Sequence, residues 1–133
     1  MRKTTQFVGA VLLGYTVVYV AQFVGSALYE GSGQVWAVLN VLSALAIAVA
    51  LGFNLRRLVS LSPQHPPDAR LSAQALVLAN AALAIWFAHN WLRLLILPAG
   101  ESVPVPHDVV WQAIGVLIPL VLVSTGWRLW RAR

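Results

Sequence analysis

The chain has 133 residues, of which 59% are hydrophobic and only 10% are charged. An ordinary soluble domain has roughly 45–50% apolar and about 25% charged residues. A soluble fold of this length cannot bury so much apolar surface, because small domains leave a large share of their area exposed. The composition therefore excludes an ordinary soluble domain and predicts an integral membrane protein whose surplus apolar surface contacts the lipid bilayer.

The net charge is +5, yet the nine lysines and arginines occur in ones and twos beside long apolar runs. Binding to nucleic acid requires a stripe of basic residues that faces phosphates, so we expect no nucleic-acid partner. The chain contains no cysteine, which excludes disulfides, thiolate metal sites and cysteine nucleophiles.

Four apolar stretches are long enough to cross a hydrocarbon core of about 30 Å, which takes roughly 20 helical residues. In chain order they are 7–28, 35–55, 71–97 and 109–130. Helices are expected because every backbone amide inside lipid must find its partner within its own segment. We therefore predict an all-α fold in which residues 1–133 form a single transmembrane domain.

Three short links join these stretches. The first, 29–34, contains two glycines, and the second and third, 56–70 and 98–108, are rich in proline, which stops helix propagation. Short links between successive helices favour antiparallel neighbours. The fold expected is a four-helix up-down bundle.

The orientation follows from the basic residues that flank the spans. Eight of the nine lie on one side: Arg2, Lys3, Arg56, Arg57, Arg70, Arg128, Arg131 and Arg133. Only Arg93 lies near the other side, together with three carboxylates. By the positive-inside rule we expect a protein of the cell membrane (inner or plasma membrane) with both termini in the cytoplasm.

The two halves of the sequence resemble each other. Residues 19–22 (YVAQ) match 86–89 (WFAH), and Val-Trp at 35–36 matches Val-Trp at 110–111. These matches predict a tandem parallel repeat of two helical hairpins, an arrangement that occurs among transporters. The alternative is chance resemblance within a restricted apolar alphabet.

Polar residues inside the spans are the best indicators of a binding site, because burying them without partners is costly. Most lie towards the outer side, and Gln22, His89, Asn90 and Arg93 form the candidate ligand-binding set. His89 and Arg93 are four residues apart and share one helical face. Arg93 is suited to an anionic group, although it can equally extend to the outer headgroups.

His89 is also the candidate for a haem or metal ligand or a proton relay, with a satisfied core histidine as the alternative. Haem ligated by two histidines needs a second buried one, and His65 and His107 both fall in loops. A zinc or copper site needs further nitrogen, sulfur or carboxylate ligands. We therefore predict no cofactor and no metal.

Small residues at fourfold spacing predict helix–helix contacts in a bilayer, because they let backbones approach closely. One such stripe lies in the second span and another, which includes an asparagine, in the third. The six candidate packing residues are Ala44, Ala48, Gly52, Asn80, Ala84 and Ala88. These faces are expected in helix–helix seams, either within the bundle or against a partner.

The chain carries no metalloprotease motif, nucleophile elbow, phosphate-binding glycine loop or dinucleotide fingerprint. We predict a non-catalytic accessory subunit of a larger membrane complex, associated with other membrane protein subunits or with copies of itself. One alternative is a small oligomeric transporter or channel that uses Gln22, His89 and Arg93. Another is a membrane redox or lipid enzyme centred on His89.

Overall fold

The computed structural model describes residues 2–62, 64–96 and 105–132, and these residues form no strand. The helices are α1 (Arg2–Gly25), the short 3₁₀ helix η1 (Ser26–Leu28), α2 (Ser32–Ser60), α3 (Pro67–Ile96) and α4 (Val105–Trp130). The all-helical prediction is confirmed for this part of the chain. Four helices are long and apolar enough to cross a bilayer, so the protein is a small membrane protein with four candidate spans.

All four α-helices begin before the predicted apolar stretches and α2 also ends after its own, because a helix can continue into the headgroup region outside its apolar run. α1 ends at Gly25, before the predicted end at 28, and the short helix η1 follows it. α2 runs to Ser60, and α3 begins at Pro67, where a proline loses no helical hydrogen bond. α4 begins at Val105, so residues 105–108 are helical where the sequence predicted a link. Residues 97–104, which hold the rest of that link, lie outside the described residues.

The first link is a tight turn at Gly31. Its φ of +82° lies in the left-handed region, which a residue with a Cβ rarely adopts. The backbone N–H of Gln34 donates to the Gly31 carbonyl at 3.2 Å and so closes the first turn of α2. Replacing this glycine would strain the hairpin between α1 and α2.

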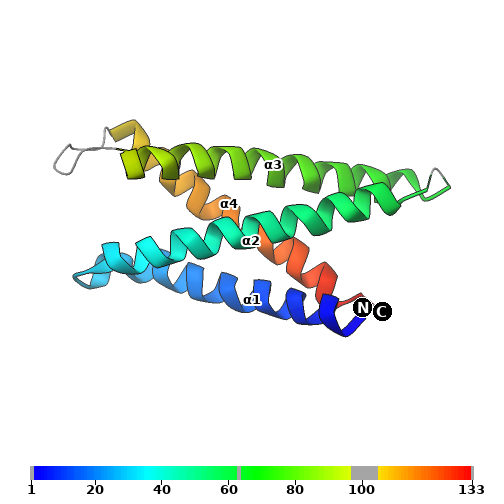
Figure 1. The fold of residues 1–133 in the computed structure, drawn as a ribbon, viewed down its shortest axis with the longest axis horizontal. Helices are drawn as coiled ribbons and strands as arrows, with labels where there is room; N and C mark the ends of the chain where they lie inside the picture. The colour runs from blue at the N-terminus through cyan, green and yellow to red at the C-terminus, as the bar shows by residue number, and fades with distance from the viewer. Residues whose placement is uncertain (1, 63, 97–104, 133) are drawn as a thin grey trace.

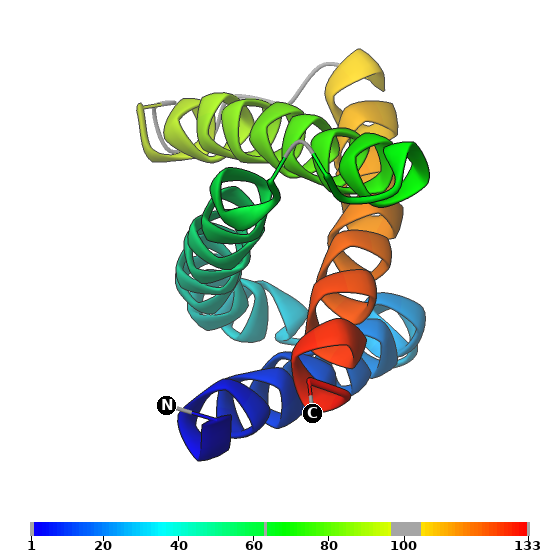
Figure 2. The same cartoon turned by 90° about the vertical axis from the view of Figure 1, so that its right-hand side faces the viewer.

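Both chain termini and the connection between α2 and α3 lie at one end of the bundle, here called the terminal end (Figure 1). The turn between α1 and α2 lies at the opposite end. Viewed along the bundle, α1 and α3 lie on opposite sides, with α2 and α4 between them (Figure 2). α4 crosses the bundle obliquely and packs against each of the other three helices.

α1 packs mainly against α4. The two backbones are closest where Gly9 meets Gly126 near the terminal end. A Cβ at Gly9 would lie 2.6 Å from the backbone nitrogen of Trp130 and 2.8 Å from the Gly126 carbonyl oxygen. This contact therefore requires glycine at position 9, a requirement that the sequence analysis missed.

The centre of the bundle is apolar, and most of its best-buried large side chains come from α4. Leu83 of α3 and Ile114, Ile118 and Leu122 of α4 have at most 1% of their surface exposed. The other large apolar residues on the helix surfaces are mostly exposed, as expected for side chains that face lipid rather than water.

Candidate functional site

The four predicted ligand-binding residues do not converge. Gln22 lies on α1 and is partly buried, with its amide oxygen accepting a 2.5 Å hydrogen bond from the Tyr29 hydroxyl. His89 and Arg93 are exposed on α3, which lies across the bundle from α1. Asn90 is buried, and its amide donates to the carbonyl of Trp86 at 2.8 Å. Gln22 thus lies on a different helix from His89 and Arg93, and a site shared by the three residues stays a prediction.

Metal-ligating residues also remain scattered. No three histidine, aspartate or glutamate residues come close enough to hold a metal ion within the described part of the chain. His89 is exposed near the end of α3, and His65 shares a 3.0 Å hydrogen bond with the Ser62 hydroxyl in the link before α3.

The stripe of small residues on α2 packs against the core at Ala44 and faces away from the bundle at Ala48 and Gly52. Ala44 is half-buried, Ala48 and Gly52 are exposed, and no atom lies within 4 Å of the position that a Cβ on Gly52 would take. The buried residues of this helix lie on another face: Leu39, Ser43, Ala46, Ile47, Ala50 and Asn54. α2 thus packs into the bundle through that face and leaves Ala48 and Gly52 uncovered by the described residues.

The second set of predicted packing residues faces inward at its first two members, since Ala84 packs against the core. Asn80 is completely buried, Ala84 is half-buried and Ala88 is exposed. Neither the amide oxygen nor the amide nitrogen of Asn80 has a hydrogen-bond partner. Burial of Asn80 agrees with a packing role, but the expected hydrogen bond across the contact is not formed among the described residues.

A buried polar cluster joins α2 to α4 near the terminal end, and the sequence analysis missed it. The side-chain oxygen of Asn54 accepts a hydrogen bond from Arg128 Nη2 at 2.7 Å. The amide nitrogen of Asn54 donates to Thr125 Oγ1 at 3.0 Å. Asn54 and Thr125 are at most 1% exposed. An available signal was the spacing of Thr125 and Arg128, which puts both on one face of a helix.

Beside this cluster, α2, α3 and α4 enclose an open groove of about 520 Å³. Its lining includes two cations and two hydroxyl groups and no carboxylate: Arg57, Ser72, Ala75, Leu76, Ala79, Ser124 and Arg128. The Ser124 hydroxyl donates to the Leu120 carbonyl at 2.7 Å, which leaves the arginines and Ser72 as the groove's available donors. Such a lining is suited to an anion.

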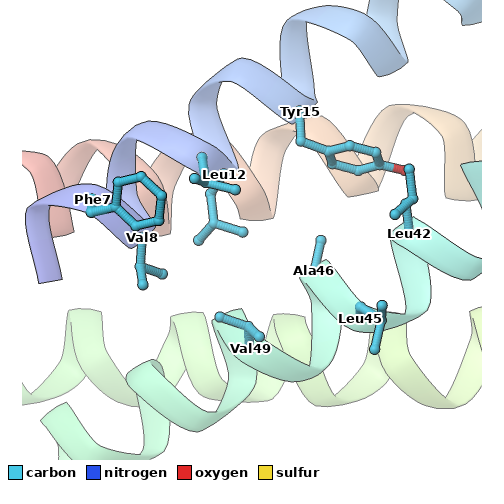
Figure 3. A pocket seen from close by; sticks show the side chains of 9 residues that line it. Phe7, Val8, Leu12, Tyr15, Leu42, Leu45, Ala46 and Val49 are labelled. Carbon is cyan, nitrogen blue, oxygen red and sulfur yellow. The ribbon is translucent and has the colours of Figure 1, made fainter. Parts of the chain in front are cut away.

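A second groove, of about 280 Å³, lies between α1 and α2 and is lined almost entirely by apolar side chains. Figure 3 shows Phe7, Val8 and Leu12 of α1 facing Ala46 and Val49 of α2. At one end the Tyr15 hydroxyl bridges the two helices. It donates to the Leu39 carbonyl at 2.9 Å and shares a 2.6 Å hydrogen bond with the Ser43 hydroxyl. This groove suits hydrocarbon and offers no chemistry of its own.

Comparison of the chain with protein-family models, with curated proteins and with solved structures gives no match.

Proposed function

We propose that this protein is a non-catalytic accessory subunit of a larger membrane assembly, and that it attaches through the outward face of α2. The observation that carries the proposal is the exposure of Ala48 and Gly52 on a face that none of the described helices covers. Together with the half-buried Ala44 they form a shallow stripe along the helix.

The physics of helix association in lipid supports this role. Lipid tails are as apolar as leucine, so helices associate through close packing and interhelical hydrogen bonds rather than through a hydrophobic driving force. A stripe of small residues lets the backbone of a partner helix come close. Asn40, one turn before Ala44 and only partly buried, supplies a polar group for a hydrogen bond to that helix. The partner proposed is a transmembrane helix of another membrane protein.

The experiment is co-purification in a gentle detergent from the membranes in which the protein is made. Tagged protein should retain a second membrane protein, and the double substitution Ala48→Leu with Gly52→Leu should reduce that protein about tenfold or more, because bulky side chains hold the helices apart. Ala82→Leu, at an exposed position of α3, is the matched control and should retain the partner.

Two outcomes would contradict the accessory role. One is a protein that purifies alone as a monomer. The other is a disulfide-linked homodimer formed by Ala48→Cys, which is informative because the natural chain has no cysteine. That dimer would assign the same face to self-association.

We further propose the cell membrane (inner or plasma membrane) as the location, with both termini in the cytoplasm and the helices in up-down order. The support is that the basic ends of α2 and α4 lie at the terminal end, as the positive-inside rule requires of the cytoplasmic side. Single cysteines test this orientation. Ser62→Cys should resist a membrane-impermeant maleimide in intact cells, and Gly33→Cys should react.

We also propose that the chain is a tandem parallel repeat of two helical hairpins. Trp36 and Trp111, the matched tryptophans, each lie edge-on against an aromatic ring of the preceding helix, Tyr19 and Phe87 respectively. The two contacts are one residue out of register, because the sequence match pairs Tyr19 with Trp86 and not with Phe87. The support for the repeat is that each matched tryptophan packs edge-on against an aromatic ring of the preceding helix. Superposition of the α1–α2 and α3–α4 hairpins with the two tryptophans paired would test it, and failure of the backbones to overlay would refute it.

A further inference from the structure

The groove between α2, α3 and α4 carries two arginines. Arg57 comes from the last turn of α2 and Arg128 from the last turn of α4. Both line one groove, and no carboxylate lines it with them. Two like charges that share a partly enclosed space repel each other, and an anion placed between them would remove that repulsion.

Arg128 is held in position before any ligand arrives. Its Nη2 donates to Asn54, whose amide is itself fixed by Thr125. The Nε of Arg128 is buried and has no hydrogen-bond partner in the part of the chain that the structure describes. A guanidinium group has five N–H donors, so its bond to Asn54 leaves most of them for a ligand. Such prior ordering lowers the entropic cost of binding.

The groove is cationic towards the terminal end and apolar towards the middle of α3. Ser72 lies near the start of α3 beside the arginines, whereas Ala75, Leu76 and Ala79 follow towards the middle of the helix. The seven helical steps from residue 72 to residue 79 span about 10 Å. An amphiphile with an anionic headgroup therefore matches the groove along its whole length.

We propose that this groove binds a phosphate group between Arg57 and Arg128. Arginine is the side chain best suited to phosphate oxygens, because its planar array of donors can make two parallel charge-assisted hydrogen bonds. Ser72 adds a hydroxyl donor. The apolar wall favours a phosphate esterified in a lipid, and a free phosphate would use the same donors.

The charge test compares neighbouring arginines of α2. Arg57→Gln removes a cation that lines the groove, whereas Arg56→Gln removes an equal charge from an exposed position that does not line it. Purified protein in a non-ionic detergent is titrated by calorimetry with dioctanoyl phosphatidylglycerol and, separately, with inorganic phosphate. Arg57→Gln should weaken binding about tenfold or more, and Arg56→Gln less than about twofold, because an exposed charge is screened.

A second pair of variants leaves the charge unchanged. Ala79→Leu fills the apolar part of the groove, and Ala82→Leu places the same side chain on α3 away from it. Only Ala79→Leu should weaken phosphatidylglycerol binding, by about tenfold or more. Binding of inorganic phosphate needs only the end of the groove that holds the arginines, so either substitution should affect it little. Because Ala79 and Ala82 are both exposed, neither substitution disturbs the interior.

Saturable binding of phosphatidylglycerol with this pattern supports the site and identifies a lipid phosphate. Binding of inorganic phosphate that is weakened by Arg57→Gln, without saturable lipid binding, supports the site with a soluble phosphate as its ligand. Failure of both probes to saturate, or equal losses in Arg56→Gln and Arg57→Gln, would overturn the proposal. None of these results bears on the α2 stripe, which lies on a different face of that helix.

Discussion

The two ends of the bundle are held together by different chemistry. Near the terminal end, the α1 and α4 backbones touch at Gly9 and Gly126. Hydrogen bonds there join Asn54 of α2 to Thr125 and Arg128 of α4. These contacts involve backbone atoms or directed bonds, so they have little freedom to adjust.

Towards the opposite end, aromatic rings fill the seams. Trp36 lies edge-on to Tyr19, with ring centroids 5.6 Å apart, and Trp111 lies edge-on to Phe87 at 5.8 Å. On the α1–α4 seam, the Phe23 ring lies where a Cβ on Gly115 would be. A ring can rotate about its side-chain torsions, whereas a backbone contact can relax only by moving a helix. Substitutions near the terminal end should therefore lower the free energy of unfolding more than substitutions in the opposite half of the bundle, here called the aromatic half.

The largest effect is expected from Gly9→Leu. A side chain at this position would meet the backbone of α4 and would force α1 and α4 apart. The apparent free energy of unfolding, measured by titration with sodium dodecyl sulfate in mixed micelles, should fall by about 3 kcal/mol or more, at the upper end of overpacking effects.

Gly14→Leu is the matched control for this test. It lies on the same helix, is exposed, and has no atom within 4 Å of its Cβ position. It also gains the same helix propensity, about 0.8–1 kcal/mol, on losing a glycine. Equal stability of the two variants would show that the α1–α4 contact does not hold the bundle together.

The next largest effect concerns two fully buried asparagines that differ in their partners. Asn54→Leu leaves Thr125 and the charged Arg128 without their hydrogen bonds, so the unfolding free energy should fall by about 2 kcal/mol. Among the described residues, neither amide atom of Asn80 has a hydrogen-bond partner. Asn80→Leu removes that unsatisfied amide and should leave the stability unchanged or raise it by about 1 kcal/mol. The same detergent titration measures both variants, and a larger loss for Asn80→Leu would refute this comparison.

The spans and their helical state could be predicted from the sequence, because bilayer thickness and the need to satisfy backbone amides act on each segment alone. The contacts between helices could not. Gly9 and Gly126 are over a hundred positions apart, and nothing in the local pattern around either one identifies the other. Arg128 was interpreted only as an orienting charge, since its bond to Asn54 depends on how α4 crosses α2.

The candidate ligand-binding residues illustrate the same limit. Gln22 and His89 were grouped because the sequence predicts similar depths in the bilayer for them. Depth follows from the distance of a residue from the end of its span, whereas the direction in which its face points depends on the neighbouring helices. α1 and α3 lie on opposite sides of the bundle, so similar depth does not make these residues neighbours.

The smallest effect is expected where the aromatic half begins, at the Tyr15 hydroxyl that bridges α1 and α2. Tyr15→Phe removes its hydrogen bonds to the Leu39 carbonyl and to Ser43 but leaves the ring in place. The unfolding free energy should fall by about 0.6 kcal/mol, the average for polar contacts between membrane helices. Ser43→Ala breaks only one of the two bonds and should cost less. In a double-mutant cycle the two substitutions should be non-additive, because they share a bond. Full additivity would mean that the bond between the two hydroxyls contributes nothing to the stability.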